Sequence, residues 1–239
     1  MAEQARRGFL PTDARDFGEA ACVTLRKAAE EVFFLLNRGY PVQASTRFVG
    51  DRYQLSERQR LALARTVSPA ESVRARRSRE ITDLRGKVID IDGFNIIIGL
   101  EIAFSRSMLF RCMDETVRDL AGLHGTYRLI PQTDLAVAAL LHTLAARGAA
   151  GAVIHLDKPV SNSGRLRARI LAIAEEQGFI PEVCIEDAVD SVLKSKPLTA
   201  SGDAIILDEC AAWYNLAADV IAQEIGDYPY IDITSQIEL

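Results

Sequence analysis

From residue 87 onward, short apolar segments alternate with longer segments of helical periodicity, and this alternation constrains the fold more than any other feature. Strands that follow one another through a helix need crossover connections, and such connections join parallel strands. We therefore expect an α/β fold with a mainly parallel sheet flanked by helices. The expected strands are residues 88–91, 152–156, 180–185, 198–201 and 230–233. The expected helices are residues 107–121, 133–147, 163–177, 187–194 and 211–225.

The first part of the chain predicts a helical segment that precedes this domain. Ser56 is expected to cap one of its helices, and residues 69–87, rich in arginine, predict a polar and partly helical linker. About 80 residues make only a marginal core by themselves, so we expect residues 1–80 to pack on the main domain, residues 87–239. The helices expected in the segment are residues 13–37, 41–49 and 57–66.

The charges of the chain are distributed unevenly along the sequence. Residues 1–87 hold 17 Lys and Arg against 11 Asp and Glu, whereas residues 88–239 hold 11 against 22. A basic segment joined to an acidic domain is typical of an enzyme that binds nucleic acid and holds a metal ion, although it is also common by chance.

Aspartates follow the expected strands at the places where they end. Asp92 ends the first strand, with Asn95 three residues later, and Asp157 ends the second. Asp190 lies in the helix after the third strand, and Asp203 follows the fourth. Carboxyl ends of parallel strands collect functional residues, and clustered carboxylates without His or Cys favour Mg²⁺ or Mn²⁺. Each aspartate taken alone could equally be a helix N-cap or a turn residue.

A polar loop leads from the second strand into the next helix. It contains Lys158, Ser161, Ser163 and Arg165. Free backbone N–H groups at a helix N-terminus, with two cations beside them, predict a phosphate-binding loop. The alternative is plain capping of the helix by Ser161 or Ser163, with solvated cations.

The cysteines and histidines show no spacing that is typical of a zinc site. Free thiols in a reducing compartment are the expected state of the cysteines, so we expect a cytoplasmic protein. His124, in a loop bracketed by glycines, is a further candidate for catalysis, with packing of the loop as the alternative. No apolar run reaches the roughly 18 residues that a membrane span needs. The cysteines and histidines of the chain are Cys22, Cys112, Cys184, Cys210, His124, His142 and His155.

The motifs around these aspartates resemble those of the PIN-like nucleases, in particular their NYN branch. Asp92-Gly93-Phe94-Asn95 resembles the D-G-x-N opening of that branch, and Leu156-Asp157 resembles its second-strand aspartate. Asp190 and Ser201-Gly202-Asp203 resemble its helix aspartate and its later S/T-x-D element. The resemblance implies a PIN-like fold for residues 87–239 and metal-dependent hydrolysis of phosphodiester bonds.

The whole chain is also similar to a set of archaeal and bacterial proteins grouped as the domain of unknown function 434 family. The similarity rests on three short segments, and the family name implies no activity. They are Leu36-Asn37-Arg38-Gly39-Tyr40-Pro41, Arg58-Gln59-Arg60 and Ser161-Asn162-Ser163-Gly164-Arg165.

The leading hypothesis is a metal-dependent nuclease that acts on RNA. Asp92, Asn95, Asp157 and Asp203 would be the catalytic residues, and Asp190 would join the three aspartates as a metal ligand. The alternative is a nucleic-acid-binding or regulatory protein with an inactive α/β domain, and a third reading is a phosphatase or nucleotide hydrolase. A homo-oligomer is compatible with all three. In the regulatory alternative, a helix-turn-helix-like pair would contact phosphates through Arg47, Arg52, Arg58, Arg60 and Arg65.

Overall fold

The computed structural model describes residues 6–122 and 125–239, which form two compact units. The α/β unit contains Arg79–Arg106 and Ala121–Tyr228, together with the described residues 6 and 7. The helical unit contains Gly8–Ser78, Ser107–Leu120 and Pro229–Leu239. Among the described residues, no helix is both long and apolar enough to cross a membrane.

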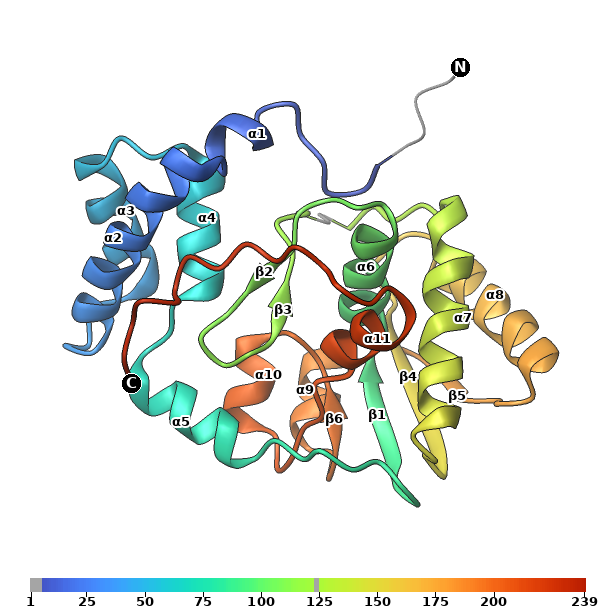
Figure 1. Cartoon of the computed structure of the whole chain (residues 1–239). Helices are drawn as coiled ribbons and strands as arrows, with labels where there is room; N and C mark the ends of the chain where they lie inside the picture. The colour runs from blue at the N-terminus through green and yellow to red at the C-terminus, as the bar shows by residue number, and fades with distance from the viewer. Residues whose placement is uncertain (1–5, 123–124) are drawn as a thin grey trace. The chain divides into compact units, whose positions relative to one another are not determined.

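The α/β unit is built on a four-stranded sheet whose paired strands are all parallel, in the order β5-β4-β1-β6 (Figure 1). Numbered along the chain within this sheet, the order is 3-2-1-4, so the direction of the connections reverses between β1 and β6. Ligands of open α/β sheets bind at such a reversal, outside the carboxyl ends of the strands. The strands are β1 (Val88–Asp92), β4 (Gly151–Asp157), β5 (Glu182–Glu186) and β6 (Thr199–Ala200).

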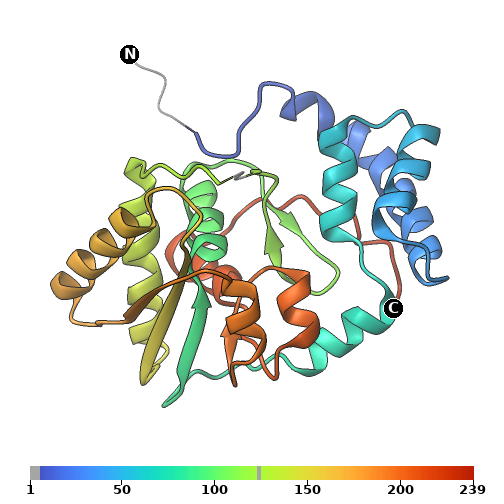
Figure 2. The ribbon, with the colours of Figure 1, turned by 180° about the vertical axis from the view of Figure 1, so that it is seen from behind.

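Helices cover both faces of this sheet (Figures 1 and 2). One face carries α6, α7, α8 and α11, and the other carries α9 and α10. The mainly parallel sheet flanked by helices, preceded by a helical segment, is therefore confirmed. The helices are α6 (Gly93–Phe104), α7 (Pro131–Ala146), α8 (Ser163–Gln177), α9 (Val189–Lys194), α10 (Ala204–Glu209) and α11 (Leu216–Glu224).

Helix α6 begins directly after β1 and fixes the backbone at the sheet's carboxyl edge. Gly93 opens the helix where it passes very close to β4: an added Cβ would lie 2.6 Å from Leu156 Cδ2 and 2.8 Å from the His155 carbonyl oxygen. Only glycine fits this approach. The helix is apolar on nearly all sides, which suits a helix buried between the sheet and its neighbours α7 and α11.

The helical unit has a core of its own. Its helices are amphipathic, and Ser56 forms a reciprocal capping box with Gln59, as the sequence predicted. The expected continuous helix over 13–37 is wrong: the chain breaks at Gly18, where an added Cβ would lie 2.7 Å from the Ala14 carbonyl oxygen. The helices are α1 (Asp13–Asp16), α2 (Glu19–Leu36), α3 (Val42–Arg52), α4 (Glu57–Thr66) and α5 (Ala70–Ser78).

Two later segments of the chain contribute to the helical unit, and both correct an expectation. The helix expected over 107–121 is wrong, since this segment forms a hairpin of β2 (Phe110–Arg111) and β3 (Val117–Arg118). Glu115 turns the hairpin with a positive φ of 65°. The expected strand 230–233 is also wrong: Ile231 forms only an isolated bridge, and the Asp232 carboxylate then accepts the Thr234 N–H and turns the chain.

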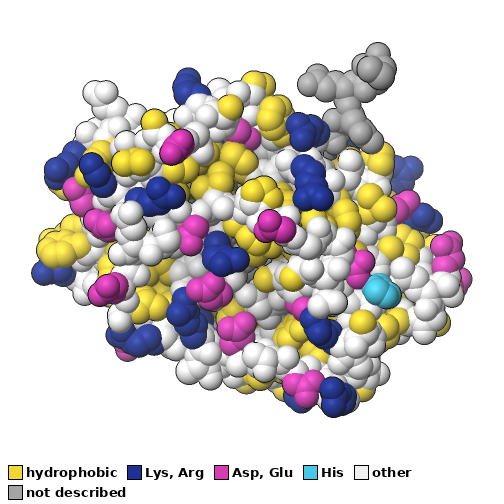
Figure 3. All heavy atoms as spheres, in the orientation of Figure 1, with side chains coloured by type: hydrophobic (Ala, Val, Ile, Leu, Met, Phe, Trp, Pro, Cys, Tyr) yellow, Lys and Arg dark blue, Asp and Glu magenta, His cyan; other side chains and the backbone are white. Residues whose placement is uncertain are grey.

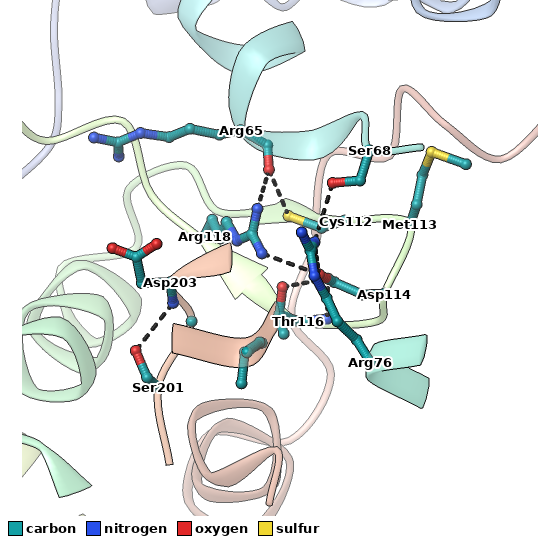
Figure 4. A network of polar contacts seen from close by, with 12 residues as sticks. Arg65, Ser68, Arg76, Cys112, Met113, Asp114, Thr116, Arg118, Ser201 and Asp203 are labelled. Carbon is teal, nitrogen blue, oxygen red and sulfur yellow. Dashed lines mark hydrogen bonds and ion pairs between the residues drawn. The ribbon is translucent and has the colours of Figure 1, made fainter. Parts of the chain in front are cut away.

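The hairpin is held to the helices by a buried ion-pair network (Figure 4). Asp114 Oδ2 lies 2.8 Å from Arg76 Nη1 and 3.0 Å from Arg118 Nη2. Burial by itself would raise the pKa of Asp114, but the two guanidinium groups and the Thr116 hydroxyl outweigh burial and lower it. The network explains how a polar segment can be built into the interior of this unit.

Candidate functional site

The carboxyl ends of β1 and β6 meet where the sheet's connections reverse, and polar side chains occupy this place. The Ser201 hydroxyl donates to Asp92 Oδ2 at 2.8 Å. The Gly202 N–H donates to Asn95 Oδ1 at 2.7 Å. These two contacts join the end of β1 to the loop after β6, so the structure brings the Asp92 and Asp203 segments together.

Asp92 is the most buried of the expected site aspartates, with 7% of the residue exposed. It caps α6, accepting the Asn95 backbone N–H at 3.3 Å. The pKa of Asp92 is raised to about 7, chiefly by burial; the charges of Asp157 and Asp203 add to the rise, and the hydrogen bonds from Ser201 and Asn95 oppose it. Asp157 and Asp203 therefore each lie close enough to Asp92 to repel its carboxylate.

Asp157 and Asp190 extend this cluster toward α9. Burial raises the pKa of Asp157, and the negative charge of Asp190 adds to the effect. Lys194, at the end of α9, faces the same charges: a hydrogen bond to Glu209 raises its pKa, and Asp190 and Asp203 raise it further. We call Asp92, Asp157, Asp190 and Asp203 the aspartate cluster.

Asp203 and Asn95 also have local structural roles. Asp203 caps α10 by accepting the Ile205 N–H at 2.9 Å, and its own N–H donates to the Ser201 hydroxyl at 3.0 Å. Asn95 was expected to orient Asp92 or a phosphate, and its backbone does contact Asp92, whereas its side chain holds Gly202. Asp92 and Asp203 are thus both candidate site residues and the N-caps of α6 and α10.

The aspartate cluster is not a tight ligand set. In the part of the chain that the structure describes, the group of three ligand side chains whose atoms all lie within 4.8 Å is His155, Cys184 and Glu186. The sequence missed this group because its members lie on two neighbouring strands, far apart along the chain. His155 also contacts Asp90, whose Oδ1 lies 2.8 Å from His155 Nε2.

The expected phosphate loop has its hydroxyls engaged within the protein. Ser161 exchanges hydrogen bonds with the Tyr127 backbone, and the Ser163 hydroxyl donates to the Asp157 carbonyl oxygen at 2.7 Å. Neither serine caps α8, since its N-cap is Asn162 in a left-handed conformation. Lys158 is exposed and lies 3.0 Å from Asp187, and Arg165 is exposed.

Arg165 lines a surface groove beside this loop. The groove has a volume of about 710 Å³. It is lined by Arg128, Leu129, Asn162, Arg165, Ala168, Arg169 and Ala172. The guanidinium group of Arg169 is engaged by both carboxylate oxygens of Asp134, at 2.7 and 2.8 Å.

Four of the five arginines expected to serve a helix-turn-helix-like pair form ion pairs within the helical unit, among them Arg52, which lies 3.4 Å from Glu31. Arg58 lies 2.6 Å from Asp13, Arg60 lies 2.8 Å from Asp51, and Arg65 contacts Asp119. The view in Figure 3 shows Lys and Arg side chains interspersed with Asp and Glu over the visible face. The remaining expected candidate, His124, lies outside the described residues.

Comparisons with known proteins divide the chain near the same point as its fold. A family profile described as a protein of unknown function (DUF434) matches residues 24–79, which confirms that resemblance for this part of the chain and not for Ser161–Arg165. A second profile, described as a domain of unknown function (DUF5616), matches residues 81–219. An uncharacterized protein of Methanocaldococcus jannaschii is 32% identical over 205 residues, which are 85% of this chain and 97% of that protein. No solved structure matches the chain significantly.

Proposed function

The chain belongs to the family described as a domain of unknown function (DUF5616), and from this premise we propose that it is a divalent-metal-dependent ribonuclease. The proposal rests chiefly on one observation: the buried Asp92 carboxylate, at the carboxyl end of β1, has its pKa raised by burial and by the charges of Asp157 and Asp203 at the ends of the neighbouring strands. A buried carboxylate beside two others is costly without a cation. The PIN-like resemblance of the motifs that carry these aspartates supplies the reaction type.

The donor set of the aspartate cluster fits a hard cation. Its four members offer carboxylate oxygens only, which Mg²⁺ and Mn²⁺ prefer. The carboxylates are not packed within 4.8 Å as a group of three. Mg²⁺ usually keeps several waters and takes one or two carboxylates directly, so it does not require three of them to meet. When bound, the cation would lower the pKa of water and neutralise charge on the scissile phosphate.

The protein's own residues would position the site. Ser201 and the Asn95 backbone hold the Asp92 carboxylate, while the Asn95 side chain holds Gly202 beside Asp203. These contacts fix the two carboxylates relative to each other before substrate arrives, which is the condition for catalysis by preorganised charge. Asp157 and Asp190 complete the negative face from β4 and α9.

The groove beside α8 supports a polyanionic substrate. Arg128 and Arg165 line it, and Asn162 links it to the loop that begins immediately after Asp157. Arginine contacts to a nucleic-acid backbone contribute affinity without sequence preference. By contrast, Arg58, Arg60 and Arg65 are engaged in ion pairs, so the helix pair α3–α4 is a weaker candidate for phosphate contact.

Cleavage assays on the full chain test the proposal. We expect hydrolysis of single-stranded RNA with Mg²⁺ or Mn²⁺, lost in EDTA and reduced at least about 100-fold by Asp92→Asn or Asp203→Asn. The matched control is Asp227→Asn, an exposed aspartate elsewhere in the α/β unit, which should keep full activity.

Parallel reactions on single-stranded DNA and small phosphoesters identify the substrate class. Cleavage of small phosphoesters alone would indicate a phosphatase instead of a ribonuclease. Full activity of Asp92→Asn would remove the aspartate cluster from the mechanism. Absence of cleavage on every substrate, with no Mn²⁺ bound at millimolar concentration, would favour the regulatory alternative.

A further inference from the structure

A second set of side chains that could bind a metal ion lies on the neighbouring strands β4 and β5. His155 on β4 is paired in register with Cys184 on β5, and Glu186 follows two residues later on β5. Alternation along a strand places Cys184 and Glu186 on the same side. One ligand atom of each of the three residues lies within 4.8 Å of the other two.

The imidazole of His155 is held in one orientation by a contact between its Nε2 atom and Asp90. The side chain is 2% exposed, and its Nε2 lies 2.8 Å from Asp90 Oδ1. Lys196 Nζ lies 3.3 Å from the same oxygen and offsets the negative charge. With Asp90 as acceptor, the neutral imidazole carries its proton on Nε2, which leaves the Nδ1 lone pair free.

The free ring nitrogen points into the group. His155 Nδ1 is buried and makes no hydrogen bond with the residues that the structure describes, and Glu186 Oε1 lies 3.6 Å away. A buried nitrogen without a partner is unfavourable and rare. A carboxylate behind a histidine whose other nitrogen faces further ligands is the arrangement that orients histidine toward a metal ion.

The donor set differs in kind from the aspartate cluster. It combines one imidazole nitrogen, one thiol sulfur and one carboxylate oxygen, a mixture suited to Zn²⁺ and not to Mg²⁺. The Cys184 thiol donates to Glu182 Oε1 at 3.3 Å, a contact that is exposed to solvent. Metal binding would remove the thiol proton to solvent and exchange this contact for a bond to the ion.

We propose that His155, Cys184 and Glu186 bind a Zn²⁺ ion, with Asp90 as the positioning residue of His155. The fourth ligand would be water or a further group, as in sites with three protein ligands. The ion would join the edge strand β5 to β4 through side chains. This site shares no ligand with the aspartate cluster, although Glu186 is paired in register with Asp157 and His155 with Asp92.

Cobalt substitution in the full chain tests the proposal, since Co²⁺ bound by a thiolate gives a near-ultraviolet charge-transfer band. One equivalent of Co²⁺ should produce the band in metal-free protein, and Zn²⁺ but not Mg²⁺ should remove it. Cys184→Ser should abolish the band. Cys22→Ser, a control in the helical unit whose thiol donates to the Phe17 carbonyl oxygen, should keep it.

Three further variants make the test independent of a single substitution. Glu186→Gln alters a half-exposed side chain and should weaken Zn²⁺ binding without unfolding, as circular dichroism would show. Asp90→Asn should weaken Zn²⁺ binding about 10- to 100-fold. Asp92→Asn should leave the band unchanged. Absence of the band in folded wild-type protein, or its persistence in Cys184→Ser, would overturn the proposal.

Discussion

Replacing Asp92 by asparagine should stabilise the metal-free protein at neutral and alkaline pH. The pKa of Asp92 is raised from 3.8 to about 7. Each unit corresponds to about 1.4 kcal/mol, so the ionised carboxylate costs the fold roughly 4 kcal/mol above pH 7. Asparagine carries no charge and keeps an oxygen for the Asn95 N–H, while its NH2 group would replace Oδ2 and donate to the Ser201 hydroxyl, which now donates to that oxygen. We expect a gain of about 2 to 4 kcal/mol, since the neutral oxygen is a weaker acceptor.

The pH dependence identifies the cause of this gain. Between the unfolded and the folded pKa the native state binds more protons than the unfolded state, so the parent loses stability as pH rises from about 4 to about 7. The asparagine variant has no such loss, and the two proteins should converge in stability below about pH 4.

Urea unfolding in EDTA, followed by tryptophan fluorescence, measures the effect. Trp213 is the only tryptophan of the chain and is fully buried in the α/β unit, so it reports on the unit that holds Asp92. Millimolar Mn²⁺ should stabilise the parent and not the variant. Destabilisation of Asp92→Asn at pH 8 in EDTA, or a gain that persists at pH 3, would refute the reasoning.

Three further predictions concern packing and ion pairs. Gly93→Ala should cost about 1–3 kcal/mol in the same fluorescence assay, because its Cβ would meet Leu156 and the His155 carbonyl, and a gain in stability would contradict this. Asp114→Asn should cost about 3–5 kcal/mol, because Arg76 stays buried without its carboxylate partner. The pKa of Asp114 is lowered in the folded state, so its contribution to the free energy of unfolding is complete above its unfolded pKa near 4 and is lost as pH falls through the folded pKa. Unfolding followed by circular dichroism should show this loss of stability in the parent and not in the variant. A fragment of residues 88–239 should not fold as in the full chain, since it carries core segments of the helical unit; a soluble fragment with an unchanged thermal transition would disprove this.

The sequence predicted the four strands of the parallel sheet, most clearly where a short run of β-branched residues ends in aspartate, but it did not predict the β2–β3 hairpin. Val88–Asp92 and Gly151–Asp157 are both strands, and the structure places Asp157 and Asp203 close to Asp92. The function of these aspartates stays a prediction. The strand order, which puts β6 beside β1, followed from no local pattern.

The main errors arose where local signals were misleading. Helix α6, which begins directly after Asp92, is absent from the helices expected from the sequence, because its uniformly apolar sequence hides its helical period. Residues 107–121 were expected to be helical, but Asp114 is used as a buried partner of two arginines in a hairpin. His155 and Cys184 meet through strand pairing, which spacing along the chain cannot reveal.

The division of the chain into interleaved segments has a consequence for its synthesis. The backbone passes from one unit to the other after residues 7, 78, 106, 120 and 228. Ile233 belongs to the core of the helical unit, yet it is translated after every residue of the α/β unit. Domains made first usually fold first on the ribosome, but here the first helices must wait for the last segment. A chain stalled before residue 229 would lack Ile233 and would therefore leave part of the apolar core of the helical unit exposed.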